Sequence, residues 1–302
     1  MKRFLLLLAI FAFCASATAQ QTYLFAHRDT CDLYLDIYKP APDTLDKPAI
    51  MFVFGGGFII GQRDSESQKH WFKRLTDNGY PVVAIDYRLG MKGHEVGAGL
   101  RGALKASNQF YLSQQIGVED VFSAVSFLAG NDLGIDVNNM VLAGSSAGAI
   151  ISLASEYEIV CGRTEGLPEG FSNFKGIMSF SGAIISVSGA PDFVREPCPM
   201  LLLHGTDDKA VAYNKYGFLG RGIWGSSYIV RQFREKGYKN YCIYRFEGRT
   251  HDVAGYMNYV WDIEEDFLEM NVMGGVVRTI DATLDISTLP SWTQVSYDSI
   301  YR

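Results

Sequence analysis

Short apolar runs alternate with amphipathic segments along most of the chain. Four such runs, each stopped by glycine, aspartate or histidine, are typical of strands buried on both faces of a sheet. They cover residues 48–54, 82–85, 140–143 and 200–203. Between them, apolar residues recur at intervals near 3.6, which predicts helices. The predicted helices cover residues 66–78, 119–129, 149–157 and 254–270, and a further strand is expected at 241–246.

Two segments alternate apolar and polar positions instead. Leu33, Leu35 and Ile37 predict an edge strand that runs into the proline-containing turn after it. Near the other end, residues 280–286 alternate in the same way, so we expect a final strand that docks on the body. The sequence indicates no role for the tail 273–302 as a whole.

Two glycine-rich segments break the alternation, residues 90–117 and 214–227. We expect long surface loops there. Loops of this kind are either simple excursions or the borders of a functional site, and the sequence leaves both readings open.

The order of the elements predicts the fold class. Strands that alternate with helices are typical of an α/β protein with a mostly parallel central sheet and helices on both faces. No linker rich in proline or serine and no shift in composition divides residues 20–302. We therefore expect a single domain over that range.

Residues 1–19 have the pattern of a signal peptide. Lys2 and Arg3 precede an apolar run, and small residues at 17 and 19 suit cleavage before Gln20. The apolar run is shorter than the roughly 20 residues that a helix needs to cross a bilayer. We expect a secreted or periplasmic protein with no membrane span after the leader is removed.

Composition and charge exclude several classes of function. The 302 residues are 48% hydrophobic and 20% charged, which excludes an intrinsically disordered chain. Acidic residues outnumber basic ones, 33 to 27, for a net charge of −6, and Lys and Arg form no run beyond the first three residues. The pattern therefore indicates no nucleic-acid partner and no anionic membrane surface.

Four cysteines follow the leader, and none belongs to a C-x-x-C pair, so a zinc site is not expected. They are Cys31, Cys161, Cys198 and Cys242. An even number in an oxidising compartment allows up to two disulfides, but the sequence cannot choose a pairing.

The segment Gly144-Ser145-Ser146-Ala147-Gly148 is a G-x-S-x-G motif between a predicted strand and a predicted helix. In that context the motif is typical of a nucleophile elbow, in which a sharp turn presents a serine above the sheet. Ser146 is therefore the candidate nucleophile. The helix that begins there also directs N–H groups and its positive dipole end toward an oxyanion.

A serine nucleophile needs a base and an acid. Of the two histidines after Ser146, His204 lies in a turn after a strand, so His251 is the candidate base by elimination and position. Asp207 and Asp208 both follow a strand end, from which a loop can direct a carboxylate toward His251. The residues alone leave both aspartates open.

A glycine run, Phe54-Gly55-Gly56-Gly57-Phe58, follows the first buried strand. Without Cβ atoms, its N–H groups can approach a ligand and supply part of an oxyanion hole. The spacing matches neither phosphate-binding glycine motif, and a plain tight turn is the alternative.

Together these motifs resemble the α/β-hydrolase fold, specifically the esterase and lipase group that includes hormone-sensitive-lipase-like esterases and carboxylesterases. The matching segments are residues 53–61, 84–89, 134–136, 144–148 and the His204-Gly205-x-x-Asp208 turn. The resemblance implies that Ser146 is the nucleophile, Asp208 the acid and His251 the base. It also implies an oxyanion hole formed by the N–H groups of Gly56, Gly57 and Ala147.

The chain departs from this group at two places. Phe54 stands where a histidine often precedes the glycine run, and the interval between residues 183 and 199 is too short for a large helical cap. We therefore expect a small or absent cap and an open site. Aromatic candidates for substrate contact are Phe58, Tyr213 and Trp224.

The resulting hypothesis is a secreted serine esterase that forms an acyl-enzyme and needs no metal or cofactor. By analogy, its substrates are short acyl or aromatic esters on oligo- or polysaccharides, and a small-molecule carboxylesterase is the main alternative. A serine peptidase and a catalytically silent binding module on the same fold are less favoured. The sequence does not indicate the acyl-chain preference, the alcohol specificity or the oligomeric state.

Overall fold

The computed structural model describes residues 20–41, 47–97, 99–285 and 288–291. The predicted signal peptide, residues 1–19, lies outside the described residues, as does most of the segment after Pro290. Within the described part of the chain, no helix is both long enough and apolar enough to span a bilayer.

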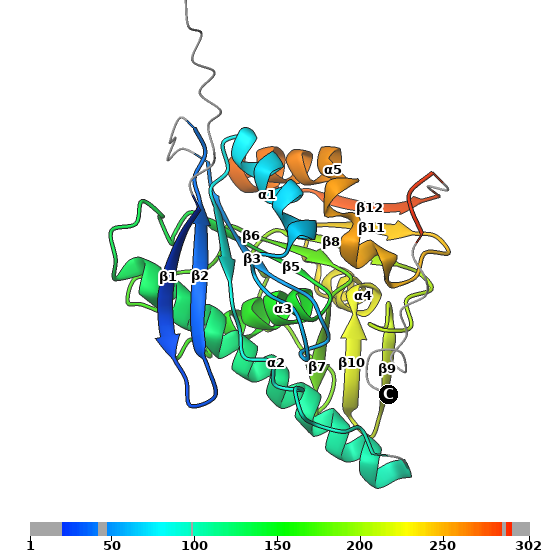
Figure 1. Cartoon of the computed structure of the whole chain (residues 1–302). Coiled ribbons are helices and arrows are strands. Elements are labelled where there is room, and N and C mark those ends of the chain that lie inside the picture. The colour runs from blue at the N-terminus through cyan, green and yellow to red at the C-terminus, as the bar shows by residue number, and fades with distance from the viewer. Residues whose placement is uncertain (1–19, 42–46, 98, 286–287, 292–302) are drawn as a thin grey trace, which may run out of the picture.

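A nine-stranded sheet forms the centre of the molecule (Figure 1). Its strands, in spatial order, are β1 (Gln20–His27), β2 (Asp32–Tyr38), β4 (Val82–Ile85), β3 (Ala49–Val53), β5 (Met140–Ser145), β6 (Gly176–Phe180), β8 (Met200–Gly205), β11 (Tyr241–Phe246) and β12 (Thr279–Leu284). The pairs β1/β2 and β2/β4 are antiparallel, and every later pair is parallel. The predicted mostly parallel sheet is confirmed.

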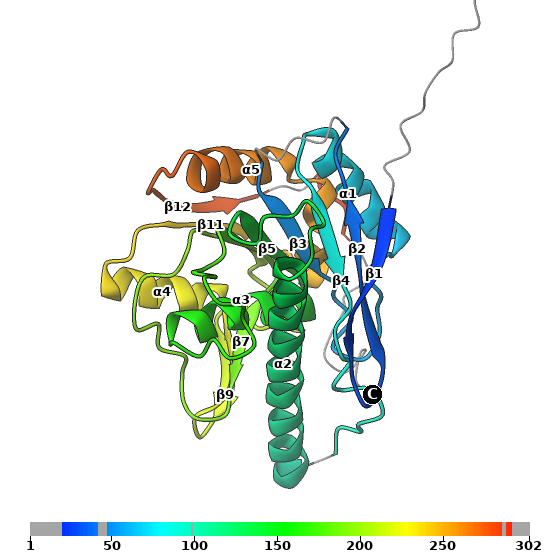
Figure 2. The ribbon, with the colours of Figure 1, turned by 90° about the vertical axis from the view of Figure 1, so that its left-hand side faces the viewer.

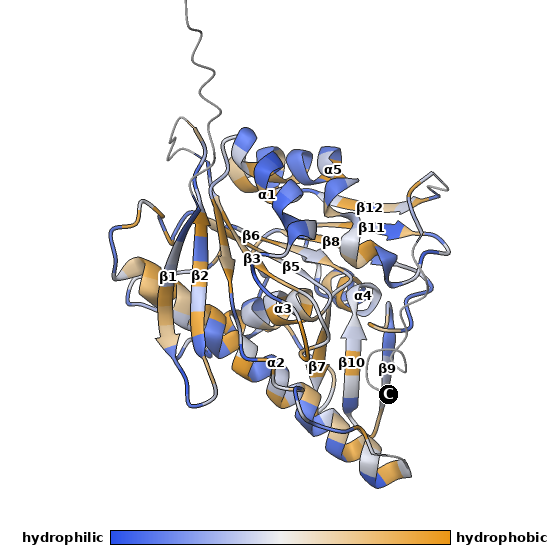
Figure 3. Ribbon diagram, viewed as in Figure 1, coloured by the Kyte–Doolittle hydropathy of each residue, from blue (hydrophilic) through white to orange (hydrophobic). Residues whose placement is uncertain are grey.

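Helices cover both faces of this sheet (Figure 1). One layer holds α1 (Glu66–Asp77), α5 (Trp261–Asp266) and the short helices η1 (His251–Asn258) and η2 (Phe267–Met273). The other holds α2 (Gly99–Ala129), α3 (Ala147–Val160) and α4 (Ser226–Lys236). All residues of β3, β4 and β5 are buried, as expected for strands covered on both sides. The central strands are also largely hydrophobic (Figure 3).

The structure corrects the expectations for the edge strand and for the helix 254–270 and confirms the one for the last strand. β2 is not the edge strand, because β1 pairs with it on the outer side. The polar start of β1, Gln20-Gln21-Thr22, hid it from the pattern of apolar positions. The predicted final strand is confirmed as β12, which pairs in parallel with β11. The expected helix 254–270 is instead divided among η1, α5 and η2.

The expectation of a loop at 214–227 is wrong. Its residues form a hairpin of β9 (Lys215–Phe218) and β10 (Arg221–Gly225), which joins β7 (Ala183–Ser186) in a second, three-stranded sheet. The two residues of the turn, Leu219 and Gly220, both have positive φ, 51° and 74°, as a tight hairpin requires. Glycines suit this hairpin because its strands lie close: a Cβ on Gly222 would lie 2.3 Å from the Tyr216 carbonyl oxygen.

The expectation of a loop at 90–117 is wrong for residues 99–117, which form the first half of the 31-residue helix α2 (Figure 2). Four of the glycines lie before or at the helix start, and Gly117 faces α3, where a Cβ would lie 2.5 Å from Ile151. The second sheet anchors this half: Gln114 accepts the Ile185 N–H at 2.7 Å and donates to the Ile185 carbonyl at 3.0 Å. Tertiary contacts thus outweigh the low helix propensity of glycine.

All four cysteines of the described chain are free thiols. Cys198 and Cys242 are buried, and burial raises the pKa of both, to about 11 for Cys242. Neither is poised to react.

Candidate active site

Ser146 occupies the sharp turn between β5 and α3. Its φ of 53° and ψ of −117° lie outside the regions that non-glycine residues favour. Its N–H donates to the Phe180 carbonyl of the neighbouring strand end at 2.9 Å. The turn is therefore held by the sheet itself.

The two glycines of the motif are required by close approach of backbones. A Cβ on Gly144 would lie 2.3 Å from the Gly148 carbonyl oxygen, and a Cβ on Gly148 would lie 2.0 Å from the carbonyl oxygen of Val53 in β3. Both distances are far below any real Cβ contact. The spacing G-x-S-x-G thus follows from a strand and a helix packed against β3 at this point.

A chain of hydrogen bonds joins three residues that are distant in sequence. His251 Nε2 lies 2.8 Å from Ser146 Oγ, and His251 Nδ1 lies 2.7 Å from Asp208 Oδ2. Ser146 follows β5, Asp208 follows β8 and His251 follows β11. Because these strands are parallel, their carboxyl ends meet at one edge of the sheet, which is where α/β folds place their sites.

The loop that carries His251 is packed tightly against the end of β8. The Asp207 N–H donates to the Arg249 carbonyl at 2.9 Å, and a Cβ on Gly205 would lie 2.3 Å from the Thr250 carbonyl oxygen. Glycine at 205 therefore lets the two loops touch. This contact positions the His251 loop beside the loop that carries Asp208.

The structure places Asp208, not Asp207, beside His251. The Asp208 side chain is buried, and its Oδ1 accepts the N–H groups of Ala210 and Val211, both at 2.9 Å. Asp207 is exposed. The geometry therefore does not support Asp207 as the partner of His251.

A second histidine, His204, lies against Asp208 and is fully buried. Its Nε2 is 3.0 Å from the Val211 carbonyl and 3.4 Å from Asp208 Oδ2. Since a carbonyl only accepts, Nε2 carries the proton, and Nδ1 faces Ser226 Oγ at 2.9 Å. The expectation that His204 lies in a turn is wrong, because the residue belongs to the last part of β8. Its spacing of four residues from Asp208 was the available signal.

The electrostatics of Asp208 reflect these two neighbours. Burial by itself would raise the pKa of the Asp208 carboxyl, but hydrogen bonds with His204 and His251, and attraction to both rings, outweigh burial and hold the pKa well below its usual range. The group is thus a permanent anion at neutral pH. An anion at this place can orient an imidazole and stabilise its protonated form.

The glycine run after β3 lies against the elbow. A Cβ on Gly55 would lie 3.2 Å from Ser146 Cβ, while Gly56 and Gly57 have φ values of 119° and 64°. A Cβ on Gly56 would lie 1.9 Å from the Ile60 carbonyl oxygen, so this turn requires glycine. Ala147 is the first residue of α3, where backbone N–H groups have no partner within the helix.

The three aromatic candidates differ in their surroundings. Phe58 follows the glycine run and is buried, with its ring 6.4 Å from that of Tyr87, so it offers a substrate almost no surface. Trp224 in β10 is also buried. Tyr213 is half-buried, and its ring lies edge-on to His204 at 5.5 Å.

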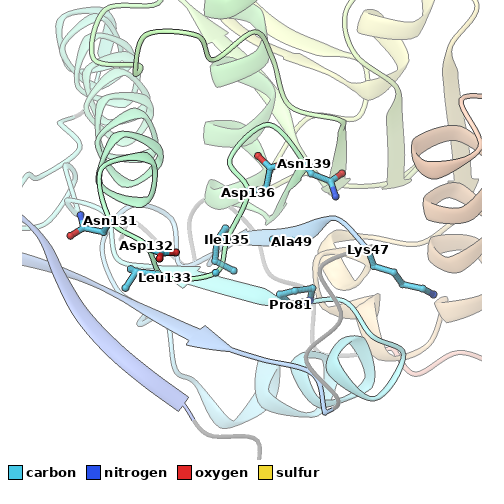
Figure 4. Close-up of a pocket in the computed structure, with 10 residues that line it drawn as sticks. Lys47, Ala49, Pro81, Asn131, Asp132, Leu133, Ile135, Asp136 and Asn139 are labelled. Atoms are coloured by element: carbon cyan, nitrogen blue, oxygen red, sulfur yellow. The ribbon is translucent and has the colours of Figure 1, made fainter.

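The pocket shown in Figure 4 is a separate feature. It has a volume of about 340 Å³, and its lining includes Ala49, Pro81 and Asn139. These residues lie at the amino ends of β3, β4 and β5. The pocket is therefore at the opposite edge of the sheet from Ser146.

Comparison with known proteins bears on this site and this fold. A family model described as BD-FAE matches residues 35–97. "Secreted lipase 1" of Botryotinia fuckeliana is 29% identical over 157 residues, which are 51% of this chain and 26% of that protein. "Ethyl acetate hydrolase" of Pseudomonas putida is 36% identical over 64 residues, 20% of each chain. The chain thus spans about a quarter of the length of these curated relatives.

Solved structures match over a much larger share. Native esterase 2 of Thermogutta terrifontis has a TM-score of 0.58 and 21% identity, with 84% of this chain and 93% of that chain covered. The butyrate-bound form of the same esterase has a TM-score of 0.59 and 22% identity. The α/β-hydrolase fold is therefore confirmed, as is the predicted resemblance to esterases and lipases.

Proposed function

We propose that this chain is a serine hydrolase of carboxylic esters. The observation that carries the proposal is the hydrogen-bonded series from Ser146 Oγ through both ring nitrogens of His251 to Asp208. In this series the serine hydroxyl lies beside a base that can take its proton, and the base lies beside a carboxylate that can stabilise the imidazolium. Nucleophilic catalysis by serine requires both pairs. The partial matches to lipases and esterases support the same activity.

In the proposed reaction, Ser146 Oγ attacks the ester carbonyl while His251 Nε2 takes its proton. His251 then gives that proton to the leaving alcohol, and an acyl-enzyme remains on Ser146. Water, activated by His251 in the same way, releases the acid and restores the serine. The Asp208 carboxylate stabilises the imidazolium during both halves.

The negative oxygen of each tetrahedral intermediate needs hydrogen-bond donors. We assign this role to the N–H of Ala147, at the positive end of α3, and to the loop of Gly56 and Gly57. All donors are backbone groups, so Phe54 in place of histidine does not remove one.

For substrates, the proposal names short acyl or aromatic esters on oligo- or polysaccharides, with small-molecule esters as the alternative. Two observations support small groups and an open site. Structures of the Thermogutta terrifontis esterase hold propionate and butyrate. In this chain only β7 and a short connection separate β6 from β8, where a large cap would be inserted. Export through the predicted signal peptide, residues 1–19, would bring the enzyme to such polymers.

The first test replaces the nucleophile and uses its neighbour as the control. Ser146→Ala should lower kcat for p-nitrophenyl acetate by about a thousandfold or more, because Ser146 Oγ is the hydroxyl that faces His251 Nε2. Ser145→Ala is the matched control, since Ser145 Oγ donates to the Ala254 carbonyl at 2.6 Å rather than to His251. It should retain kcat within about tenfold. Full activity in Ser146→Ala would refute the proposal.

The substrate class is tested by a panel. Release of acetate and ferulate from acylated oligosaccharides is compared with turnover of p-nitrophenyl esters of increasing chain length. A higher kcat/KM for the sugar esters would support the polysaccharide proposal. Equal or better turnover of the simple esters would replace it with a small-molecule carboxylesterase.

A further inference from the structure

Two elements project from the body on the same side and form one surface. They are residues 99–118 of α2 and the hairpin, residues 215–225; we call this surface the basic apolar face. Both project beyond the body in each view (Figures 1 and 2). A hydrogen bond from Arg221 of the hairpin to Asn108 of α2 links them.

Large apolar side chains on this face are exposed to water. On the hairpin, Tyr216 is 80%, Phe218 65% and Leu219 77% exposed. On α2, Leu100 is 66% and Leu112 52% exposed. Leu219 lies in the turn at the tip of the hairpin, and Leu100 is the second residue of α2. Exposed apolar groups gathered in this way mark a site of interaction.

All charged residues of the basic apolar face are positive. Residues 99–118 contain Arg101 and Lys105 and no acidic residue, and residues 215–225 contain Lys215 and Arg221 and no acidic residue. The chain as a whole has 33 acidic and 27 basic residues, so the face is positive on an acidic protein. Its occupant should therefore be anionic as well as apolar.

We propose that the basic apolar face docks on an anionic lipid surface. Such a surface accepts projecting aliphatic and aromatic side chains at its acyl boundary, while its head groups attract the surrounding Lys and Arg. A second copy of this chain fits less well, because a two-fold contact would bring the cations of one face against those of the other. An acidic polysaccharide would match the charge but would leave the two leucine tips without an apolar partner.

The sequence expectation of no anionic membrane surface rested on the absence of Lys and Arg runs. The fold changes that expectation because the hydrogen bond from Arg221 to Asn108 joins the hairpin, which carries Lys215 and Arg221, to the helix, which carries Arg101 and Lys105. The inference does not rest on the proposed esterase activity. None of the face residues belongs to the hydrogen-bonded series around Ser146.

The experiment is co-sedimentation of the mature chain with lipid vesicles. One set contains phosphatidylcholine alone, and in the other about a third of the lipid is phosphatidylglycerol. We expect at least about tenfold tighter binding to the anionic set, since each cation near such a surface contributes roughly a fivefold factor. High salt should weaken the binding.

Two variants test the face and two control for surface changes elsewhere. Leu219→Asn replaces the apolar side chain at the hairpin tip by a polar one, and asparagine tolerates the φ of 51° at this position. Lys215→Glu reverses one charge. Each should weaken binding to anionic vesicles by about fivefold or more. The controls are Val277→Asn and Lys175→Glu, which alter exposed residues at the amino edge of the sheet. They should leave binding unchanged.

Several results would overturn the inference. These are no binding to either vesicle set, equal binding to both, or equal weakening by the control variants. Binding to polygalacturonate with none to vesicles would assign the face to an acidic polysaccharide instead. Turnover of p-nitrophenyl acetate by the same samples reports separately on the proposed esterase, so one failure is not mistaken for the other.

Discussion

Asp208 is the most constrained side chain at the candidate site, because two backbone N–H groups and two imidazoles surround its carboxylate. Asp208→Asn should lower kcat for p-nitrophenyl acetate by about a thousandfold or more, since a neutral amide cannot stabilise the imidazolium of His251. Asp207→Asn is the matched control and should change kcat little, because Asp207 is exposed. A larger loss from Asp207→Asn would reverse the assignment.

His204 gives a prediction about positioning. His204→Leu removes the donor to Val211 and the neighbour of Asp208 Oδ2, so the acid loses part of its support. We expect kcat to fall by roughly ten- to a hundredfold with KM nearly unchanged. His204→Gln keeps an N–H donor near the place of Nε2 and should recover part of the loss. Equal loss in both variants would indicate a packing role only.

The elbow motif and the order of residues were enough to select Ser146 and His251 from the sequence, and the structure brings their side chains within 2.8 Å of each other. It could not resolve the contribution of His204. Whether a histidine at a strand end points away from the neighbouring acid or toward it depends on contacts from other parts of the chain, here the Val211 carbonyl and Ser226.

Among the elements, α5 carries a buried acid that should make stability depend on pH. Glu264 accepts the indole N–H of Trp71 in α1 at 2.6 Å, and burial raises its pKa from 4.5 to about 8. Between these values the folded protein keeps a proton that the unfolded chain releases. The free energy of unfolding should therefore fall as pH rises through this window.

Glu264→Gln tests this dependence while keeping an acceptor for Trp71. Unfolding by denaturant should show the variant more stable than the native protein at pH 9, by a few kcal/mol, with the difference nearly gone at pH 5. A difference that does not change with pH would show that ionisation of Glu264 is not its cause.

The sequence patterns failed to predict the elements that are rich in glycine. The hairpin β9–β10 and the first half of α2 looked like loops because glycine lowers the propensity for strands and helices. In the structure these glycines serve contacts between elements, such as the approach of Gly222 to Tyr216 and of Gly117 to Ile151. Such contacts join segments that a local pattern cannot compare.

For the whole molecule, the layered α/β arrangement was predictable because buried parallel strands have a distinct apolar signature. The second sheet and the edge position of β1 were not, since both depend on which strands pair. The same holds for the basic apolar face, which exists only after α2 and the hairpin are brought together.

The three residues of the candidate site follow three separate strands, β5, β8 and β11, and 105 residues separate Ser146 from His251. Contacts between such distant segments form late, because the loop between them must first be closed. Regain of turnover during refolding should thus report the last pairings of the sheet rather than the first helices. The candidate site would in this way report when folding is complete.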